Sequence, residues 1–248
     1  MFLIEEDKLF FGAAVNYYDI CWVYPLKIKE IIGLGQDKYN EFLSILCVDI
    51  RSIQKELKKS GIPDEQLPGS AFEYLFNQCK IDSTFLVKFQ EALFTFIREK
   101  VHLSFEHNEI IIGNDFSEKR KRLDKTSFND IQNILRAQNK LPVPEPIPEN
   151  ENPMARKFRL RREQVAEAKL KQAQKSGEVV SLMDSIAVLI CFGIGISFDE
   201  IKDLTIYQFK SLLARAQAKY KYDLDIRMIA AGADPKKIKP KHWFGKID

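Results

Sequence analysis

The sequence is poor in glycine and histidine, and it lacks the short motifs that mark many enzymes. Of its 248 residues only 11 are glycine and three are histidine. It has no G-x-x-x-x-G-K-S/T loop, no G-x-S-x-G turn and no G-x-G-x-x-G after a strand. The G-x-G of residues 193–195 follows an apolar helical run, which predicts a helix end rather than a phosphate-binding loop. We therefore expect no enzymatic activity, no catalytic residues and no cofactor.

Cysteine is also scarce, and no metal-binding spacing occurs. The four cysteines are Cys21, Cys47, Cys79 and Cys191. They are far apart and lie among apolar residues, which is typical of buried, reduced thiols in an intracellular protein. The absence of C-x-x-C and H-E-x-x-H excludes the common zinc patterns. His102 and His107 have no nucleophile or carboxylate at a diagnostic spacing, so a structural role is favoured over that of a catalytic base.

Charge excess and long apolar runs are absent as well. The 38 basic and 35 acidic residues leave a net charge of only +3, which argues against a general affinity for polyanions. Acidic residues near the N-terminus stand where a signal peptide carries lysine or arginine. The longest apolar run, residues 185–198, is too short to cross a bilayer and predicts a buried helix. We expect no membrane association.

The first 140 residues read as a helical domain with a small β element. Residues 17–24 predict one strand covered on both faces, and Pro25 opens a helix that ends at Gly33 or Gly35. Apolar residues at spacings of three and four predict further helices over 37–59, 70–80 and 82–100.

The period then changes from helical to alternating. Residues 101–106 and 109–112 predict a β-hairpin. A charged loop, EKRKRLDK, leads to a helix over 127–140 with Ser127 as its N-cap and Asp130 at the third position.

Residues 141–153, LPVPEPIPENENP, predict an extended linker. Five prolines exclude a helix or an interior strand, and three glutamates keep the segment solvated. The linker separates the N-terminal domain, 1–140, from a basic segment, 154–178.

The basic segment has high helix propensity over residues 154–175 and carries eight basic residues against two acidic ones. Its apolar stripe is thin: Met154, Phe158, Val165 and Ala168. One interpretation is a solvated helix or a flexible arm. The other is a partner-binding or phosphate-binding arm. The candidate partner-binding residues here are Phe158, Arg159, Arg162 and Val165.

Residues 179–248 read as a compact helical module with a lysine-rich tail. Three capping boxes are legible: Ser181 with Asp184, Ser197 with Glu200, and Thr205 with Gln208. They predict helices over 182–192, 198–203 and 206–220, and a fourth from 222 or 223 to 231 that Gly232 ends. In the tail, Trp243 and Phe244 either pack back onto the module or form an exposed hook for a partner. The fold class expected for the whole chain is mainly α, of α+β type.

Three stretches of the chain have distinctive combinations of residues, which we call signatures. The N-terminal signature comprises Tyr24-Pro25, Ile28, Glu30-Ile31, Tyr39, Phe42 and Leu43. The middle signature is Gln138-Asn139 before the linker. The C-terminal signature comprises Thr205, Tyr207, Gln208, Tyr222 and Trp243-Phe244. Together the three signatures resemble small tail-region proteins of phages and prophages of Gram-positive bacteria, most of all the tail assembly chaperones.

The resemblance implies a non-enzymatic role in tail morphogenesis, in the cytoplasm of the bacterial host. A protein of this family binds the long tape-measure protein, keeps it soluble and helps to recruit tail-tube subunits; self-association is a further expectation. Two alternatives stay open, because the basic segment and the lysine-rich tail depart from the family pattern. One is a structural tail or connector component retained in the particle. The other, less favoured, is a nucleic-acid-binding accessory protein.

Overall fold

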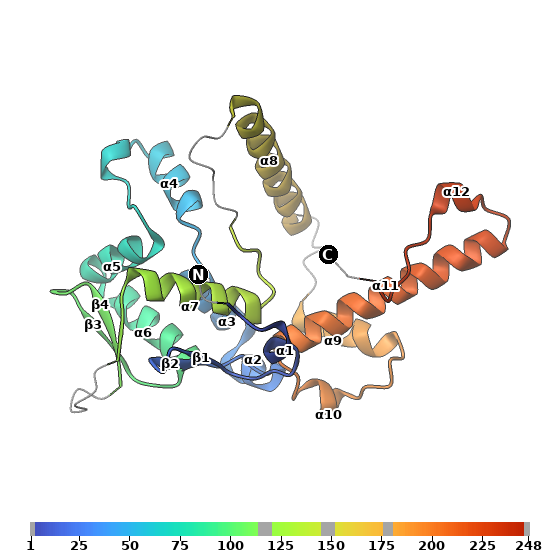
Figure 1. Cartoon of the computed structure of the whole chain (residues 1–248), viewed down its shortest axis with the longest axis horizontal. Helices are drawn as coiled ribbons and strands as arrows, with labels where there is room; N and C mark the ends of the chain where they lie inside the picture. Colours follow the sequence, from blue (N-terminus) through green and yellow to red (C-terminus); the bar gives the residue numbers. More distant parts are fainter. Residues whose placement is uncertain (1–2, 114–120, 145–151, 176–180, 246–248) are drawn as a thin grey trace. The chain divides into compact units, whose positions relative to one another are not determined.

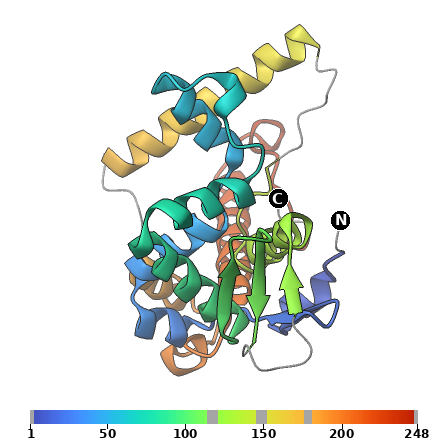
Figure 2. The ribbon, with the colours of Figure 1, turned by 90° about the vertical axis from the view of Figure 1, so that its left-hand side faces the viewer.

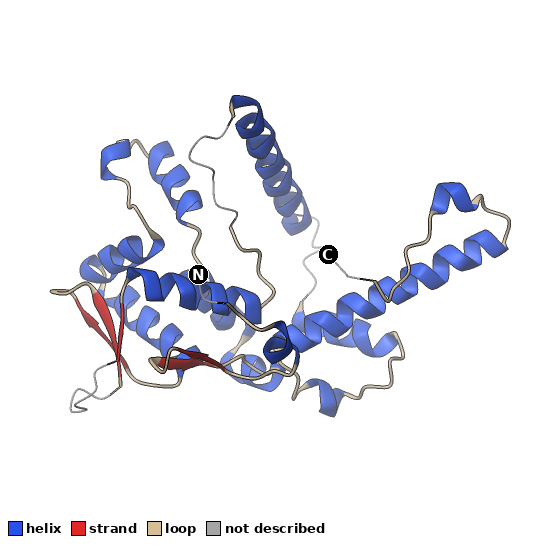
Figure 3. Cartoon of the chain, in the orientation of Figure 1, coloured by secondary structure: helices blue, strands red, loops and turns tan. Residues whose placement is uncertain are grey.

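The structure is a computed structural model that describes residues 3–113, 121–144, 152–175 and 181–245. Within these residues the chain is mainly helical with two small antiparallel sheets, which confirms the expected fold class (Figure 1, Figure 3). Part of the predicted linker (145–151), the end of the basic segment (176–178) and the last tail residues (246–248) lie outside the described ranges.

The chain forms two compact units. Unit 1 comprises Met1–Val143 with Asp199–Ala214, and unit 2 comprises Pro144–Phe198 with Arg215–Asp248. The sequence placed residues 199–214 in the C-terminal module, whereas their contacts group them with the N-terminal part of the chain.

Unit 1 contains both sheets and most of the helices. Its elements are α1 (Glu6–Phe10), β1 (Val15–Tyr17), β2 (Cys21–Val23), α2 (Ile28–Leu34), α3 (Gln36–Leu46), α4 (Ile50–Lys59), a short 3-10 helix (Asp64–Gln66), α5 (Ala71–Ile81), α6 (Ser83–Ile97), β3 (Val101–Ser104), β4 (Glu109–Ile112), β5 (Lys121–Leu123), α7 (Lys125–Gln138), most of α10 (Phe198–Ile201) and the first turns of α11 (Ile206–Ala230). The helix expected after Pro25 is α2, which ends at Gly35.

The single strand expected over residues 17–24 is wrong. The segment forms the second half of a hairpin, β1–β2, that turns at Tyr18 and Asp19, both of which have positive φ. The Asn16 side chain binds Asp19 and stabilises this turn. Only one face is covered, because Cys21 and Val23 on β2 are buried while Trp22 between them is exposed.

The single helix expected over residues 37–59 is divided into α3 and α4. Asp49 caps α4 by accepting a hydrogen bond from the backbone N–H of Arg51. The carbonyl groups at the end of α3 find partners on α7: Gln132 donates to Leu46, and Arg136 donates to Cys47 and Val48. The break is therefore stabilised by side chains distant in sequence.

The hairpin expected over residues 101–112 is confirmed as β3 and β4, and a third strand joins it (Figure 2). Strand β5, which was predicted to be part of a charged loop, pairs Leu123 with Ile110 of β4. Both side chains are fully buried, so burial of Leu123 accounts for pairing in a segment whose other residues are charged.

Helices α5, α6 and α7 build the core of unit 1. The predicted helices over 70–80 and 82–100 are confirmed, with Ser70 and Asp82 as their N-caps. Aromatic rings of these helices pack together. The ring centre of Phe72 on α5 lies 4.3 Å from that of Phe76 and 5.5 Å from that of Phe128 on α7. The expected cap of α7 was wrong: Asp124, not Ser127, accepts the first-turn hydrogen bond, from the N–H of Ser127 at 2.8 Å.

Unit 2 contains α8 (Pro153–Lys175), α9 (Leu182–Cys191), the later part of α11, and α12 (Pro235–Ile238). Helix α8 confirms the helix expected over 154–175, and Ser181 with Asp184 forms the expected capping box of α9. The expected break between residues 220 and 222 is wrong, because α11 runs unbroken to Ala230, before Gly232 with φ 98°.

The apolar run 185–198 is only partly buried. Ile186 and Leu189 on α9 are buried, whereas Val188, Ile194 and Phe198 are exposed. None of the helices in the described part of the chain is long and apolar enough to span a bilayer.

Candidate functional site

Helix α8 carries the four residues that the sequence proposes as its partner-binding face. Phe158, Arg162 and Val165 are spaced by four and three residues, so they lie on one face of the helix. Phe158 is 62% exposed, Val165 and Arg162 are also exposed, and Arg159 is half-buried. Exposed apolar side chains in a row beside arginines are typical of a surface that binds a partner.

The face of α8 opposite Phe158 carries one exposed apolar residue, Leu160. It is two residues from Phe158, points to the other side of the helix and is 42% exposed. It stands alone there between Arg156 and Gln164, four residues away on either side. An apolar residue of comparable size therefore exists on each face, but only the Phe158 face has a stripe.

The tail residues Trp243 and Phe244 take part in an aromatic cluster of unit 2. The ring of His242 lies 4.9 Å from Tyr222 and 4.6 Å from Phe244, and the rings of Trp243 and Phe244 are 4.0 Å apart. Arg215 donates to the carbonyl oxygens of Trp243 and Gly245, at 2.7 and 2.8 Å.

The tail packs back onto unit 2 and also leaves an apolar side chain exposed, so each of the two interpretations drawn from the sequence is correct in part. The cluster packs back onto α11 through Tyr222 and Arg215, and Trp243 is half-buried. Phe244, however, remains 70% exposed, which leaves one large apolar ring available to a partner.

Residues of all three family-like signatures lie in unit 1 near the C-terminal end of α7, whereas Tyr222 and Trp243-Phe244 of the C-terminal signature lie in unit 2. Gln138 donates from its amide to the carbonyl oxygen of Val23, next to Tyr24, at 2.9 Å. Asn139 accepts a hydrogen bond from the hydroxyl group of Tyr39 on α3. The middle signature is thus attached to the N-terminal one at two points.

The C-terminal signature reaches the same place through α11. Lys210 donates to the carbonyl oxygen of Asn139 at 2.8 Å, and the Lys140 ammonium lies 4.7 Å from the centre of the Tyr207 ring. Desolvation lowers the pKa of Lys210, and the nearby Lys140 lowers it further. Sequence reasoning missed both lysines, because no local pattern distinguishes them from solvated surface lysines.

A second attachment joins α2 to the segment before α11. The backbone of residues 26–29 pairs with that of 202–206: Ile28 donates to Leu204, Lys29 to Lys202, and Lys27 forms a β-bridge with Thr205. We call these two segments the α2–α11 junction.

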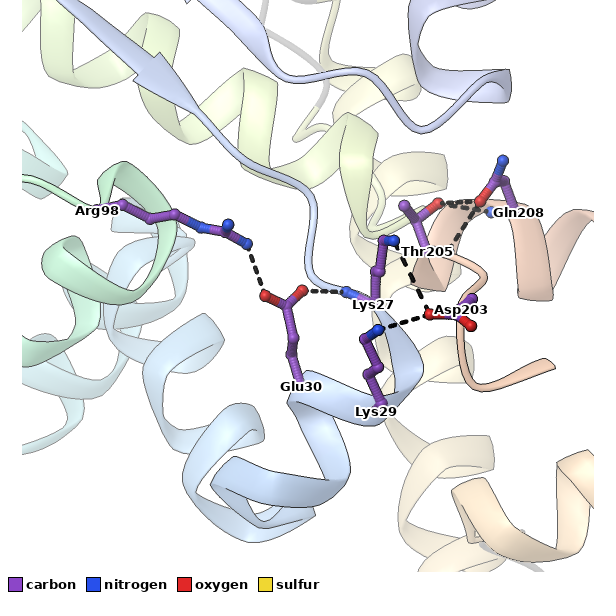
Figure 4. Close-up of polar contacts among 7 residues, drawn as sticks. All are labelled: Lys27, Lys29, Glu30, Arg98, Asp203, Thr205 and Gln208. Carbon is purple, nitrogen blue, oxygen red and sulfur yellow. Dashed lines mark hydrogen bonds and ion pairs between the residues drawn. The ribbon is translucent and has the colours of Figure 1, made fainter. Parts of the chain in front are cut away.

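Side chains around the junction are already engaged with one another (Figure 4). Asp203 accepts from Lys29 at 2.6 Å, which lowers the pKa of its carboxyl group. Glu30 accepts from the backbone of Lys27 and from Arg98, at 2.8 and 2.7 Å.

Thr205 and Gln208 complete the predicted capping box at the start of α11. The Gln208 side chain accepts from the N–H of Thr205 at 2.8 Å, and the Thr205 hydroxyl accepts from the N–H of Gln208 at 3.3 Å. Gln208 also donates to the carbonyl oxygen of Phe10 at 3.0 Å. Thr205 and Gln208 of the C-terminal signature therefore form hydrogen bonds to backbone groups at the start of α11 and at Phe10.

A surface cavity of about 500 Å³ lies beside α5 and the start of α7. Phe72 and Phe76 supply apolar walls, and Glu73 and Asp124 are its carboxylates. Both carboxylates already serve the backbone, Glu73 by accepting from Gly69 and Asp124 by capping α7. The two carboxylates of the cavity are therefore engaged by backbone N–H groups of this chain.

The histidines and cysteines of the described residues are distributed over several elements. His102 pairs with Ile111 across the β-hairpin, and His107 is exposed in the turn. No three acidic, histidine or cysteine side chains of the described residues gather at metal-binding distance. Cys21 and Cys79 are buried as expected, whereas Cys191 is exposed, so the expectation of burial is wrong there.

One comparison with known proteins bears on the C-terminal part. Residues 171–248 match the family model described as the YomV second domain. The matched segment runs from the end of α8 to the tail and covers less than a third of the chain. No curated protein and no solved structure matches the chain.

Proposed function

We propose that the protein is a phage or prophage tail assembly chaperone that binds the tape-measure protein in the bacterial cytoplasm. Two observations support this. In unit 1, Asn139 of the middle signature is hydrogen-bonded to Tyr39 of the N-terminal signature, and Tyr207 of the C-terminal signature lies beside Lys140, the residue after Asn139. Residues 171–248 resemble the second domain of YomV, a protein of a Bacillus prophage region.

The single observation that carries the proposal is the exposed stripe on α8. Phe158 and Val165 offer an apolar surface to a helix, and Arg162 lies between them. A tape-measure protein is long and helical by the same resemblance, and an amphipathic helix buries its apolar face most readily against another such face. The eight basic residues of 154–175 favour a partner helix with acidic edges.

Co-expression with the tape-measure protein of the same phage or prophage tests the proposal. The full chain should form a complex with it and increase its soluble fraction. Phe158→Ser combined with Val165→Ser should abolish both effects, because the polar side chains remove the apolar stripe. Leu160→Ser is the matched control on the other face and should leave both effects intact. Equal loss in the control, or no complex with the unaltered chain, contradicts the proposal.

The charge of α8 favours one second function, binding of nucleic acid. Eight basic residues on one helix would release counterions on contact with phosphates, so affinity would fall steeply with salt. A DNA shift with a salt slope that Arg162→Ala reduces, together with no tape-measure complex, would favour this function. Retention of the protein in purified particles, measured by mass spectrometry, would instead favour a structural tail component.

A further inference from the structure

The later part of α11, in unit 2, presents an apolar stripe to solvent. Tyr220, Leu224 and Met228 are spaced by four residues and are 58%, 45% and 46% exposed. Their spacing places them on one face of the helix. We call these three residues the α11 stripe.

The other side of the same helix is apolar too, and the tail partly covers it. Tyr222, which points away from the α11 stripe, lies 4.9 Å from the ring of His242. A helix that is apolar on two sides is typical of one that is enclosed on both. Within unit 2, the ring of Phe192 reaches the first residue of the stripe, Tyr220, at 5.6 Å, yet Tyr220 remains more than half exposed.

Charged residues flank the α11 stripe on both edges, and their order indicates which kind of helix can pack on it. Along one edge Lys219 precedes Asp223 by four residues, and along the other Lys221 precedes Asp225 by four. Lys219 and Asp223 are paired within the helix at 2.7 Å, and their side chains remain 52% and 40% exposed. Each edge therefore runs from positive to negative in the direction of the chain.

The order of lysine before aspartate on each edge favours an antiparallel over a parallel arrangement of two copies of α11. In an antiparallel pair of helices like edges face each other, so the lysine of one copy lies opposite the aspartate of the other. In a parallel pair, residues of the same number lie level, and lysine faces lysine. The α11 stripe is thus self-complementary under a two-fold axis.

We propose that two copies of this chain associate through antiparallel packing of their α11 stripes, centred near Tyr222. Tyr220 of each copy packs on Leu224 of the other. Lys219 and Lys221 of each copy face Asp223 and Asp225 of the other.

The proposal does not depend on the proposed function, and its test uses no tape-measure protein. Sedimentation of the purified full chain over a range of concentrations should show a reversible monomer–dimer equilibrium. A single stripe buries less than a standard interface, so the dimer should dissociate on dilution. A chain that is monomeric throughout overturns the proposal.

Two charge-reversed variants test the geometry. The acidic variant carries Lys219→Glu and Lys221→Glu, and the basic variant carries Asp223→Lys and Asp225→Lys. Each alone places like charges on facing edges and should weaken self-association about tenfold or more. An equimolar mixture restores every opposite-charge pair and should dimerise at least as well as the unaltered chain.

Circular dichroism distinguishes loss of the interface from loss of the fold. Both variants should keep most of the helix content of the unaltered chain, because Lys219 and Lys221 are exposed, Asp223 and Asp225 are only partly buried, and each like-charge i,i+4 pair within α11 costs only about 0.2–0.5 kcal/mol. Leu224→Ser should also weaken the dimer, without rescue by mixing. Variants that dimerise as well alone as in the mixture, or a mixture that stays monomeric while the unaltered chain dimerises, overturn the antiparallel arrangement.

Discussion

The ammonium group of Lys210 donates a hydrogen bond to the carbonyl oxygen of Asn139 across 2.8 Å. This contact joins the first turns of α11 to the end of α7, 71 residues earlier in the chain. Asn139 in turn binds Tyr39 of α3. One buried asparagine therefore connects three segments of unit 1, and the groups around it are good places to test the fold.

Lys210 should make stability depend on pH at the alkaline end. Desolvation lowers its folded-state pKa below the ordinary value of 10.5, so over the window between the two values the unfolded chain binds the extra proton. The contribution of Lys210 to the free energy of unfolding should therefore rise with pH through that window and level off above 10.5. Urea unfolding measures this contribution as the difference in stability between the unaltered chain and Lys210→Met, which should increase with pH in that window; a difference that stays constant would contradict the assignment.

Tyr39 and Asn139 should be energetically coupled. Both side chains are buried, so removing one partner leaves the other without its hydrogen bond. Tyr39→Phe and Asn139→Ala should each destabilise unit 1, and a double-mutant cycle should give a coupling of about 1–2 kcal/mol. Additive effects would show that the hydroxyl group of Tyr39 does not depend on Asn139.

Gly12 should tolerate no side chain. Its φ is +69°, and a Cβ atom there would lie 2.9 Å from Cγ2 of Thr205. Gly12→Ala should therefore cost the strain of the positive φ and the clash together, roughly 2–3 kcal/mol. Gly193→Ala is the control, because Gly193 has a similar φ of +64° but nothing within 4 Å of its Cβ position. Its cost, measured by urea unfolding, should be about 1 kcal/mol.

Asp124 should stabilise α7 in a pH-dependent way. Hydrogen bonding from the N–H of Ser127 lowers the pKa of its carboxyl group below 3.8. The charged cap therefore contributes stability above pH 3.8, and this contribution is lost as the pH falls through the lowered pKa. At neutral pH Asp124→Ala should cost about 1 kcal/mol, whereas Asp124→Asn, which keeps an acceptor, should cost less. Between pH 4 and pH 2 the difference between the unaltered chain and Asp124→Asn should shrink; a constant difference would contradict this role of the charge.

Local signals predicted the elements that depend on local chemistry. Ser70, Ser181 and Thr205 start α5, α9 and α11 as their capping patterns indicate. These bonds close within three residues, so the sequence contains both partners side by side.

Elements that depend on distant partners could not be predicted. Strand β5 exists because Leu123 pairs with Ile110, and α3 ends where Arg136 binds the carbonyl of Cys47, 89 residues away. Helix α11 was divided wrongly at Tyr222 because aromatic and acidic residues were interpreted as a new start. The i,i+4 pair of Lys219 and Asp223 instead supports continuation of the helix.

In the candidate site, too, features set by local spacing were predictable from the sequence, and features set by distant contacts were not. The sequence placed Phe158 and Val165 on one face of a helix, because helical spacing is a local property. It could not show that the Gln138-Asn139 pair binds Val23 and Tyr39, because these contacts depend on the tertiary fold.

The four thiols should differ sharply in reactivity. Burial raises the pKa of the thiols of Cys21 and Cys79 to about 12 and that of Cys47 to about 11, so all three are protonated at neutral pH. Cys21 and Cys79 are also buried, and Cys47 is half-buried. Cys191 at the end of α9 is exposed. A thiol reagent at pH 7.5 should therefore modify Cys191 rapidly and the other three only on unfolding, because the thiolate is the reactive form and access is needed. Mass spectrometry should find one label on the native chain and four in denaturant. The variant Cys191→Ser is the control and should take up none rapidly, whereas rapid labelling of Cys21 in it would contradict the burial of β2.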